Sequence, residues 1–193
     1  FVIAHLLEGT KYKRIYLFLF LIPFIIPSGT IVKFWKMLFD YHGLLNKILY
    51  SFGIEPTYWY LGNFSKMILN SIFIYKNIGF HIFLFSTGLS MIPKDFYDYA
   101  AIEGANGWKK FRFVTLPCIL PVGFFATVMA LVHSFNVFRE IYVLFGDYPN
   151  ESIYMLQHYM NNQFNKLNFS NLTSASFLLK MVIAFIISGI YIY

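Results

Sequence analysis

The sequence has 193 residues, of which 58% are hydrophobic and only 12% are charged. The charged share is about half that of a soluble domain, so a soluble fold of this size could not hide its apolar surface. The net charge of +6 does not indicate nucleic-acid binding, because the basic residues cluster beside long apolar runs, as in membrane proteins. The composition therefore predicts a chain embedded in lipid.

Four apolar stretches have the length of about 20 residues that a spanning helix needs. They run from about Ile15 to Trp35, Met67 to Leu89, Phe113 to Phe135 and Leu172 to Tyr193. Residues 1–7, which precede Glu8, are too few to cross a bilayer, and the last run reaches the chain end. We expect an all-α membrane bundle with four full spans and a partial N-terminal helix, with both chain ends inside membrane helices.

Two of these stretches contain helix-breaking residues. The first carries Pro23, Pro27 and Gly29, and the third carries Pro117 and Pro121. Membrane helices tolerate such residues where neighbouring groups satisfy the freed backbone atoms. The prolines therefore do not argue against spanning helices.

Clusters of basic residues predict the orientation of the chain. Lys11, Lys13 and Arg14 precede the first span, and four basic residues lie between the second and the third: Lys94, Lys109, Lys110 and Arg112. Because positive loops stay in the cytoplasm, both clusters are predicted to lie there, as two crossings between them require. Segments 40–65 and 136–171 then face outward, although some basic residues also lie in or next to them: Lys47, Lys66, Arg139 and Lys166.

One outward segment shows helical periodicity. Ile153, Leu156, Met160 and Phe164 recur at the spacing of an amphipathic helix over residues 151–164. We expect this helix on the outer surface, with an irregular loop as the alternative.

The most informative stretch is IPKDFYDYAAIEGANGWKKFRFVTLPCILP, residues 92–121. Pro93 suits the first turn of a helix, and Asp95 suits its positive end. Tyr97, Ala100, Ala101 and Gly104 share one mostly small face, Gly104 can end the helix in a left-handed turn, and Asn106 can cap a second short helix. These features predict a helix–turn–helix element, about residues 92–112, that is built to dock on another protein.

This stretch resembles the EAA loop of ABC-importer permeases, whose pattern is Glu-Ala-Ala, three residues, Gly, nine residues, Ile-x-Leu-Pro. Asp98, Tyr99 and Ala100 occupy the first three places, Gly104 follows, and Val114 to Pro117 complete the pattern with every spacing kept. Tyr99 is a departure, while Asp98 and Val114 are milder ones. The resemblance implies that the coupling residues are Asp98, Tyr99, Ala100, Glu103, Gly104, Ala105, Leu116 and Pro117.

The resemblance extends over nearly the whole chain and is greatest to the carbohydrate branch, of maltose and glycerol-phosphate type. It is carried by PFIIPSG at 23–29, HGLLN at 42–46, LNSIFIYKNIGF at 69–80 and FNVFREIYVLFGDYP at 135–149. Asp147 and Tyr148 replace family glycines, so the turn there is expected to differ. The resemblance implies one permease domain over residues 1–193 that lacks the family's first span and most of the second.

By this resemblance, the chain is a multi-pass subunit of the cell membrane that imports a sugar or similar small polar solute by alternating access. Its implied partners are a cytoplasmic ABC ATPase dimer, a second permease subunit, an extracytoplasmic solute-binding protein and membrane lipid, with no nucleic acid. The chain itself is expected to be no enzyme and to bind no cofactor, since it has no P-loop and ATP is used by the partner.

Polar residues within spans are costly and are functional candidates by default. Together with nearby aromatic residues, they could supply the hydrogen bonds and apolar faces that a sugar needs, and the substrate-path candidates are Phe80, His81, His133, Ser134, Asn136 and Phe138. The alternative for His81 and His133 is that they only bond to neighbouring helices. Lys76 is expected to pair or to extend towards the interface rather than to bind substrate.

Three other functions are the alternatives for this chain. A permease for peptides or amino acids would share the EAA loop but not the HGLLN and FNVF stretches. A membrane enzyme is disfavoured, because the sequence has no HExxH, no Gly-x-Ser-x-Gly and no histidine–carboxylate spacing typical of a metal site. A passive channel would not need a cytoplasmic docking loop.

Overall fold

The computed structural model describes residues 1–61 and 63–192, and these form helices and connecting turns with no strand among them. The prediction of an all-α membrane fold is confirmed. In chain order the elements are α1 (Val2–Glu8), α2 (Lys13–Ile25), α3 (Ser28–Phe39), α4 (Leu44–Ser51), α5 (Asn63–Ser90), α6 (Lys94–Ile102), α7 (Gly107–Lys110), the π-helical turn η1 (Phe111–Thr115), α8 (Leu116–Phe135), α9 (Val137–Phe145), the 3-10 turn η2 (Glu151–Ile153), α10 (Leu156–Asn165) and α11 (Phe169–Ile192).

The chain forms two compact units, each made of two chain segments. Unit 1 comprises Phe1–Ile31 and Ser71–Asn136, and unit 2 comprises Val32–Asn70 and Val137–Tyr193. Helices α3 and α5 each contribute residues to both units. The prediction of a single permease domain over residues 1–193 stays a prediction.

The described residues contain three helices that are long and apolar enough to cross a membrane: Phe64–Ser90, Gly107–Phe145 and Phe169–Gly189. A fourth span results if the bent pair Lys13–Ile25 and Ser28–Ser51 is counted as one. These four correspond to the four predicted stretches, and α1 is the expected short N-terminal helix.

The first predicted span is not one continuous helix. Its break lies at Ile26, which has an extended backbone with ψ of 133°. The following proline causes this, because its ring clashes with a helical conformation of the residue before it. Pro27 then starts α3 by accepting a hydrogen bond from the N–H of Thr30 (3.0 Å), whereas Pro23 lies inside α2.

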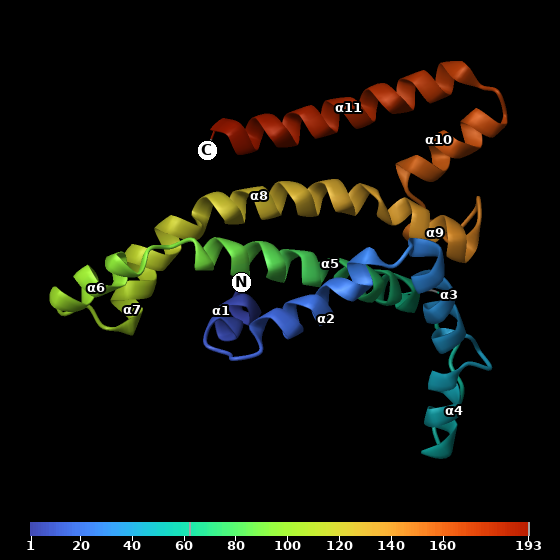
Figure 1. Ribbon diagram of the computed structural model, residues 1–193. Coiled ribbons are helices and arrows are strands. Elements are labelled where there is room, and N and C mark those ends of the chain that lie inside the picture. The colour runs from blue at the N-terminus through green and yellow to red at the C-terminus, as the bar shows by residue number, and fades with distance from the viewer. Residues whose placement is uncertain (62, 193) are drawn as a thin grey trace. The chain divides into compact units, whose positions relative to one another are not determined.

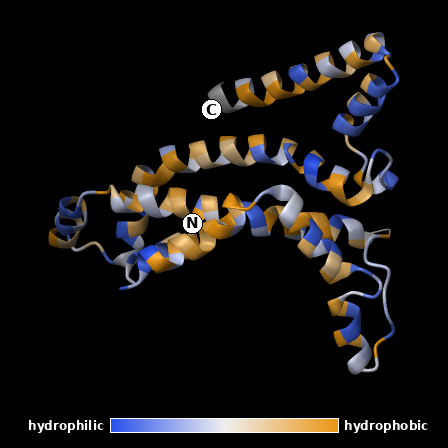
Figure 2. Cartoon of the chain, turned by 45° about the vertical axis from the view of Figure 1, so that its right-hand side comes forward, coloured by the Kyte–Doolittle hydropathy of each residue, from blue (hydrophilic) through white to orange (hydrophobic). Residues whose placement is uncertain are grey.

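The core of unit 1 lies between α1, α2, the second half of α5, and α8, and the last three of these run side by side in Figure 1. Its buried residues are Ala4, Leu7, Ile82, Leu89 and Ile119. Figure 2 shows that α8 and the second half of α5 are mostly apolar. Much of this apolar surface is exposed. Only 17% of the most apolar stretch of the span Gly107–Phe145 is buried, which fits a helix surrounded by lipid.

Helices α2 and α5 meet at Gly79. A Cβ atom added to Gly79 would overlap the backbone carbonyl of Phe20. Small residues allow such direct backbone contact between membrane helices. Gly79 therefore sets how closely α2 packs on α5.

A polar cluster joins α1 and α2 to the end of α5 in the same unit. The Glu8 carboxylate accepts hydrogen bonds from Lys13 Nζ (2.7 Å) and Ser86 Oγ (2.8 Å). Lys13 Nζ also donates to Ser90 Oγ (2.6 Å). Because Ser90 lies only four residues before α6, this cluster fixes the α5 end from which α6 extends.

Unit 2 has its own small core, formed by Leu69, Ile141 and Ile153. The predicted amphipathic helix over residues 151–164 is wrong in its start, because the chain forms the short turn η2 first and α10 begins only at Leu156. Its periodicity is also interrupted: His158 and Asn162 are buried, whereas Phe164 is exposed.

Asp147 explains the burial of Asn162. Its backbone carbonyl accepts a hydrogen bond from Asn162 Nδ2, and its carboxylate accepts one from Asn161 Nδ2, both at 3.0 Å. The residue before it, Gly146, has a positive φ of 74°. The departure at Asp147 thus ties the turn to α10.

His158 is fully buried within this arrangement. Its Nδ1 accepts a hydrogen bond from the Met155 N–H (3.2 Å), and its ring packs edge-on against Phe138. Burial lowers the pKa of His158, and the Asp147 carboxylate acts in the opposite direction. The neutral imidazole is therefore the form that holds this segment together.

We expect Gly79→Ala to destabilise the protein, because the added methyl group must displace the α2 backbone. Overpacking of this kind costs about 1–3 kcal/mol, which outweighs the gain of up to about 1 kcal/mol from replacing a helical glycine. The midpoint of thermal unfolding in detergent should fall clearly. Gly123→Ala is the matched control, because its Cβ would meet only Phe85 at 3.8 Å, an ordinary contact. Equal midpoints for the two variants would contradict the close contact.

We expect acid to loosen α10. An unfolded segment protonates its histidine near pH 6.5, whereas buried His158 takes up a proton only at lower pH. The stabilisation is thus present above about pH 6.5 and is lost as the pH falls below it. Hydrogen exchange of residues 155–165, corrected for intrinsic rates, should accelerate several-fold between pH 7.5 and pH 5.

His158→Met should remove most of that acid response, since Met can pack in the same place but does not titrate. His42→Met serves as the control because His42 is exposed. A response that persists in His158→Met would assign the effect to other groups.

Candidate functional site

The predicted docking element is present as α6, a turn and α7. At the end of α6 the Gly104 N–H donates to Ala101 O (3.0 Å) and the Ala105 N–H donates to Ala100 O (2.8 Å). This pair of bonds is a Schellman motif, which needs a left-handed residue after the helix. Gly104 provides it with a φ of 73°, so the predicted left-handed turn is confirmed.

The second short helix also starts as expected. The Asn106 side-chain oxygen accepts a hydrogen bond from the Lys109 N–H (2.9 Å) and caps α7. Asp95 lies in the first turn of α6, while Pro93 precedes that helix by one residue instead of starting it. The π-helical turn η1 then leads into α8, with Pro117 in its first turn.

The faces of α6 differ from the expected ones. Tyr97 turns towards its own chain, where its hydroxyl lies 2.9 Å from the hydroxyl of the buried Thr115. The outward surface is instead an apolar stripe of Phe96, Tyr99 and Ile102, which are 47%, 67% and 83% exposed. Tyr97 therefore anchors the element, and the exposed stripe is the surface available to a partner.

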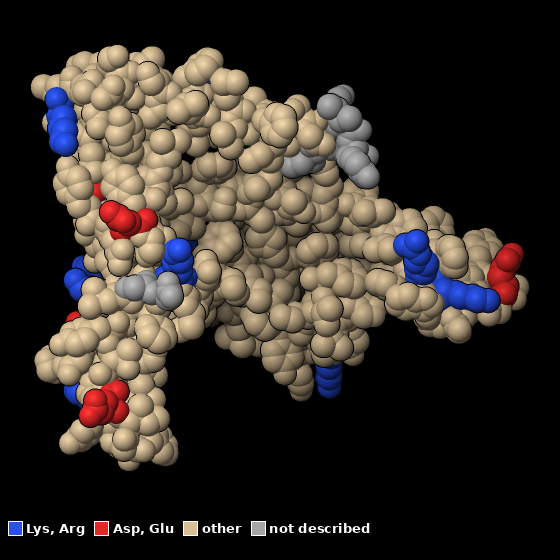
Figure 3. Space-filling model, turned by 180° about the vertical axis from the view of Figure 1, so that it is seen from behind, with Lys and Arg blue, Asp and Glu red and all other residues tan. Residues whose placement is uncertain are grey.

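The predicted coupling residues occupy this element and the start of α8. Asp98, Tyr99, Glu103 and Gly104 are exposed, and Ala100 and Ala105 are half-buried. Leu116 and Pro117 lie beyond η1 in the first turn of α8. Figure 3 shows Lys and Arg side chains beside acidic ones at the projecting end that α6 and α7 form.

Three of the six predicted path residues come together within unit 1. The Phe80 and His133 rings lie 5.4 Å apart, and those of His81 and His133 lie 6.4 Å apart. Phe24 was not among the predicted residues, but its ring stacks on Phe80 (4.9 Å) and lies 5.5 Å from His133. We call Phe24, Phe80, His81 and His133 the aromatic–histidine cluster.

The two histidines of this cluster differ in their hydrogen bonding. His81 Nδ1 lies 2.9 Å from Asn77 O, and Nε2 lies 3.2 Å from Ala126 O on α8. His81 thus joins two helices, as its alternative interpretation proposed. By contrast, buried Nδ1 of His133 has no hydrogen-bond partner among the described residues.

The other three predicted path residues lie elsewhere. Ser134 donates its hydroxyl hydrogen to Leu131 O (2.7 Å) in its own helix, and Asn136 is exposed at the end of α8. Phe138 belongs to unit 2, where it packs against His158 at a centroid distance of 4.7 Å. Lys76 donates to the Ser28 hydroxyl, in line with its expected pairing role.

No three His, Cys, Asp or Glu side chains within residues 1–61 and 63–192 come together as possible metal ligands. Two features of unit 1 can bind another molecule: the exposed stripe of α6 and the aromatic–histidine cluster.

Comparison with known proteins gives one family match over the whole chain. Residues 1–193 match the family described as "Binding-protein-dependent transport system inner membrane component".

Two relatives illustrate the similarity. The trehalose/maltose transport system permease protein MalF of Thermococcus litoralis is 31% identical over 146 residues, which cover 74% of this chain and 49% of that protein. The galactooligosaccharides transport system permease protein GanP of Bacillus subtilis is 34% identical over 147 residues, covering 74% of this chain and 35% of that protein. The chain thus spans about half or less of the length of these relatives.

A solved structure shares the fold. It is a bacterial ABC transporter involved in the import of the acidic polysaccharide alginate. The match has a TM-score of 0.84 at 20% sequence identity and covers 98% of this chain and 69% of that one.

We expect His81→Leu to lower the thermal-unfolding midpoint and His133→Leu to leave it nearly unchanged. A neutral His81 ring donates one hydrogen bond at a time, and such a bond between membrane helices contributes about 0.6 kcal/mol. His133→Leu keeps an apolar side chain beside Phe24 and Phe80 and removes no hydrogen bond from Nδ1. If His133→Leu proved the more destabilising change, the assignment of His81 as the helix-joining residue would be wrong.

Proposed function

Because the chain belongs to the family of binding-protein-dependent transport system inner membrane components, we propose that it is a permease subunit of an ABC importer for a sugar or similar small polar solute. The observation that carries this proposal is the exposed element α6–Gly104–α7, whose geometry suits docking on a partner protein. The chain contributes no catalysis, and ATP is hydrolysed by the partner.

The exposed stripe is the proposed contact with a cytoplasmic ATPase dimer. Phe96, Tyr99 and Ile102 recur every three residues, so they lie close together on one side of α6. Exposed aromatic side chains are strong anchors at protein interfaces, because they bury a large area at low entropic cost. Asp98 and Glu103 flank the stripe and are the proposed polar contacts.

Motion of the ATPase would reach the membrane through bonds inside unit 1. The Tyr97–Thr115 contact joins α6 to the start of α8, while the Glu8 cluster holds the end of α5. A displacement of α6 therefore acts on α8 first. Rocking of whole helices around a midplane site is the expected form of alternating access in such importers.

The aromatic–histidine cluster is the proposed part of the solute path in unit 1. Aromatic rings offer flat apolar faces to a sugar ring, and the His133 Nδ1 atom offers a hydrogen-bonding position. Ser134, Asn136 and Phe138 stay predicted members of the path. The named solutes of the two relatives, trehalose or maltose and galactooligosaccharides, support the sugar class.

The remaining proposed partners are a second permease subunit and an extracytoplasmic solute-binding protein. The latter is supported by a structure to which this chain matches with a TM-score of 0.80. That structure is a bacterial alginate ABC transporter in complex with a periplasmic protein to which an alginate pentasaccharide is bound. No cofactor is proposed for this chain.

The solute class can be tested by uptake into cells that carry the complete transporter. Labelled sugars, peptides and amino acids would be offered separately. Uptake of a sugar alone supports the proposal, whereas uptake of only peptides or amino acids would replace it with the other permease class.

We expect Gly104→Val to leave normal amounts of protein in the membrane but to abolish ATP-driven uptake. A branched side chain at a φ of 73° costs about 1–2 kcal/mol and distorts the turn that presents the stripe. The ATPase should co-purify poorly with the full-length variant.

The matched control is Gly53→Val. Gly53 has a similar φ of 77° and no atom within 4 Å of an added Cβ, but it lies outside the α6–α7 element. It should retain both ATPase binding and uptake. Normal uptake by Gly104→Val, or an equal defect in both variants, would refute the docking role of the turn.

A further inference from the structure

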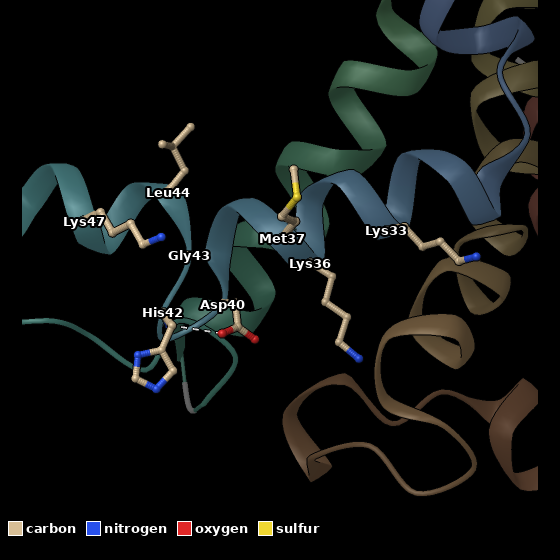
Figure 4. Close-up of a pocket in the computed structure, with 8 residues that line it drawn as sticks. All are labelled: Lys33, Lys36, Met37, Asp40, His42, Gly43, Leu44 and Lys47. Carbon is tan, nitrogen blue, oxygen red and sulfur yellow. Dashed lines mark hydrogen bonds between the residues drawn. The ribbon is translucent and has the colours of Figure 1, made fainter.

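Helices α3 and α4 form an open groove of about 550 Å³ within unit 2. Its lining residues are Lys33, Lys36, Met37, Asp40, His42, Gly43, Leu44 and Lys47. Figure 4 shows that Met37 and Leu44 point to one side of the chain, whereas Lys36, Asp40 and His42 point to the other. The groove thus has an apolar side and a charged side.

Tight local packing holds this groove in shape. A Cβ atom on Gly43 would lie 2.6 Å from Met37 O and 2.8 Å from Asp40 O, so α4 can start this close to the end of α3 only because residue 43 is glycine. The Gly43 N–H also donates to Asp40 O (2.8 Å). The groove is therefore a fixed feature of the turn between the two helices.

The Asn46 side chain fixes the first turn of α4. Its Nδ2 donates to Tyr41 O and Thr57 O, both at 2.9 Å, and its Oδ1 accepts from the Thr57 N–H (3.1 Å) and Trp59 Nε1 (2.8 Å). Asn46 is 2% exposed, so these bonds are protected from water. They also fix the backbone that carries Lys47.

The charges of the groove are not balanced. Lys33, Lys36 and Lys47 are exposed, and their ammonium groups form no hydrogen bond or ion pair with any described residue. The one carboxylate, that of Asp40, accepts a hydrogen bond from the His42 N–H (3.1 Å). Three ammonium groups therefore share one groove with a single carboxylate, which favours an anionic ligand.

Exposed apolar side chains accompany these lysines. Phe34, Met37 and Leu44 are 53%, 67% and 56% exposed. Alternation of basic and apolar residues on short helices is typical of elements that lie in a membrane interface, with the apolar side in the acyl region and the lysines among the headgroups. A soluble anion would have no use for the apolar side.

We propose that this groove binds the phosphate-bearing headgroup of an anionic phospholipid, with the acyl chains along Met37 and Leu44. The site is independent of which solute is transported. It also gives a role to Lys47, which lies in the outward segment 40–65, and to Lys33 and Lys36, which lie at the outward end of the first predicted span, where lysines are uncommon. Anionic headgroups there supply the counter-charge.

The test is native mass spectrometry of the full-length protein in detergent, titrated with phosphatidylglycerol or phosphatidylcholine. The measured quantity is the dissociation constant of the first bound lipid. Wild type should prefer phosphatidylglycerol, and the triple variant Lys33→Gln/Lys36→Gln/Lys47→Gln should bind it about ten-fold or more weakly, since each lysine near a headgroup contributes about five-fold in affinity.

The control removes equal charge from exposed residues of the same unit outside the groove: Lys66→Gln/Arg139→Gln/Lys166→Gln. Its dissociation constant should stay within about two-fold of wild type. An equal loss of phosphatidylglycerol affinity in both triple variants would indicate diffuse electrostatic attraction instead of a site. No loss in either variant would show that the lysines do not bind the lipid.

Two further measurements separate this ligand from others. Gly43→Ala keeps every lysine but displaces α4, and it should weaken phosphatidylglycerol binding while phosphatidylcholine binding is unchanged. Glycerol phosphate and an acidic oligosaccharide should not compete at concentrations equal to the lipid. Competition by either would show an anion site that needs no acyl chain. Displacement of bound phosphatidylglycerol by an added solute-binding protein would assign the groove to that protein.

Discussion

The absence of water from the lipid interior is the constraint on which the structure depends. Every backbone N–H and C=O group there must be bonded inside the protein, which limits the chain to helices and allows a break only where other groups compensate. Both irregular places in the predicted spans follow this rule. The break at Ile26 is bridged by Pro27, which lacks an N–H and accepts the first bonds of α3, and the π turn at Phe111–Thr115 keeps its hydrogen bonds within the helix.

Local sequence rules predicted those features that depend on a few neighbouring residues. The length of the apolar runs indicated the spans, and the spacing of Gly104 and Asn106 indicated a turn and a cap that the structure contains. The direction of Tyr97 was not predictable in this way, because it depends on Thr115, which lies eighteen residues later. Likewise, the position of Phe24 beside Phe80 and His133 arises from the packing of α2, α5 and α8.

A residue that departs from the family pattern can have a structural role of its own, and Asp147 is an example. Asp147 stands where the related sequences are expected to have glycine, and it holds α10 through Asn161 and Asn162. The bond from Asn162 explains why a polar residue is buried on this helix, which the apolar periodicity of residues 151–164 did not indicate. A helix can bury polar side chains when each finds a partner, and a count of apolar residues then misplaces both its start and its inner face.

The π turn before α8 has a consequence for changes in chain length. Such a turn holds one residue more than a regular helical turn, and the extra residue bulges out while the helix on either side keeps its phase. A chain shortened by one residue within Phe111–Thr115 could therefore form a regular helix and still present Ile119 and Ala126 to the interior. Elsewhere in α8 the same deletion would rotate all later side chains by about 100° and turn buried residues towards lipid.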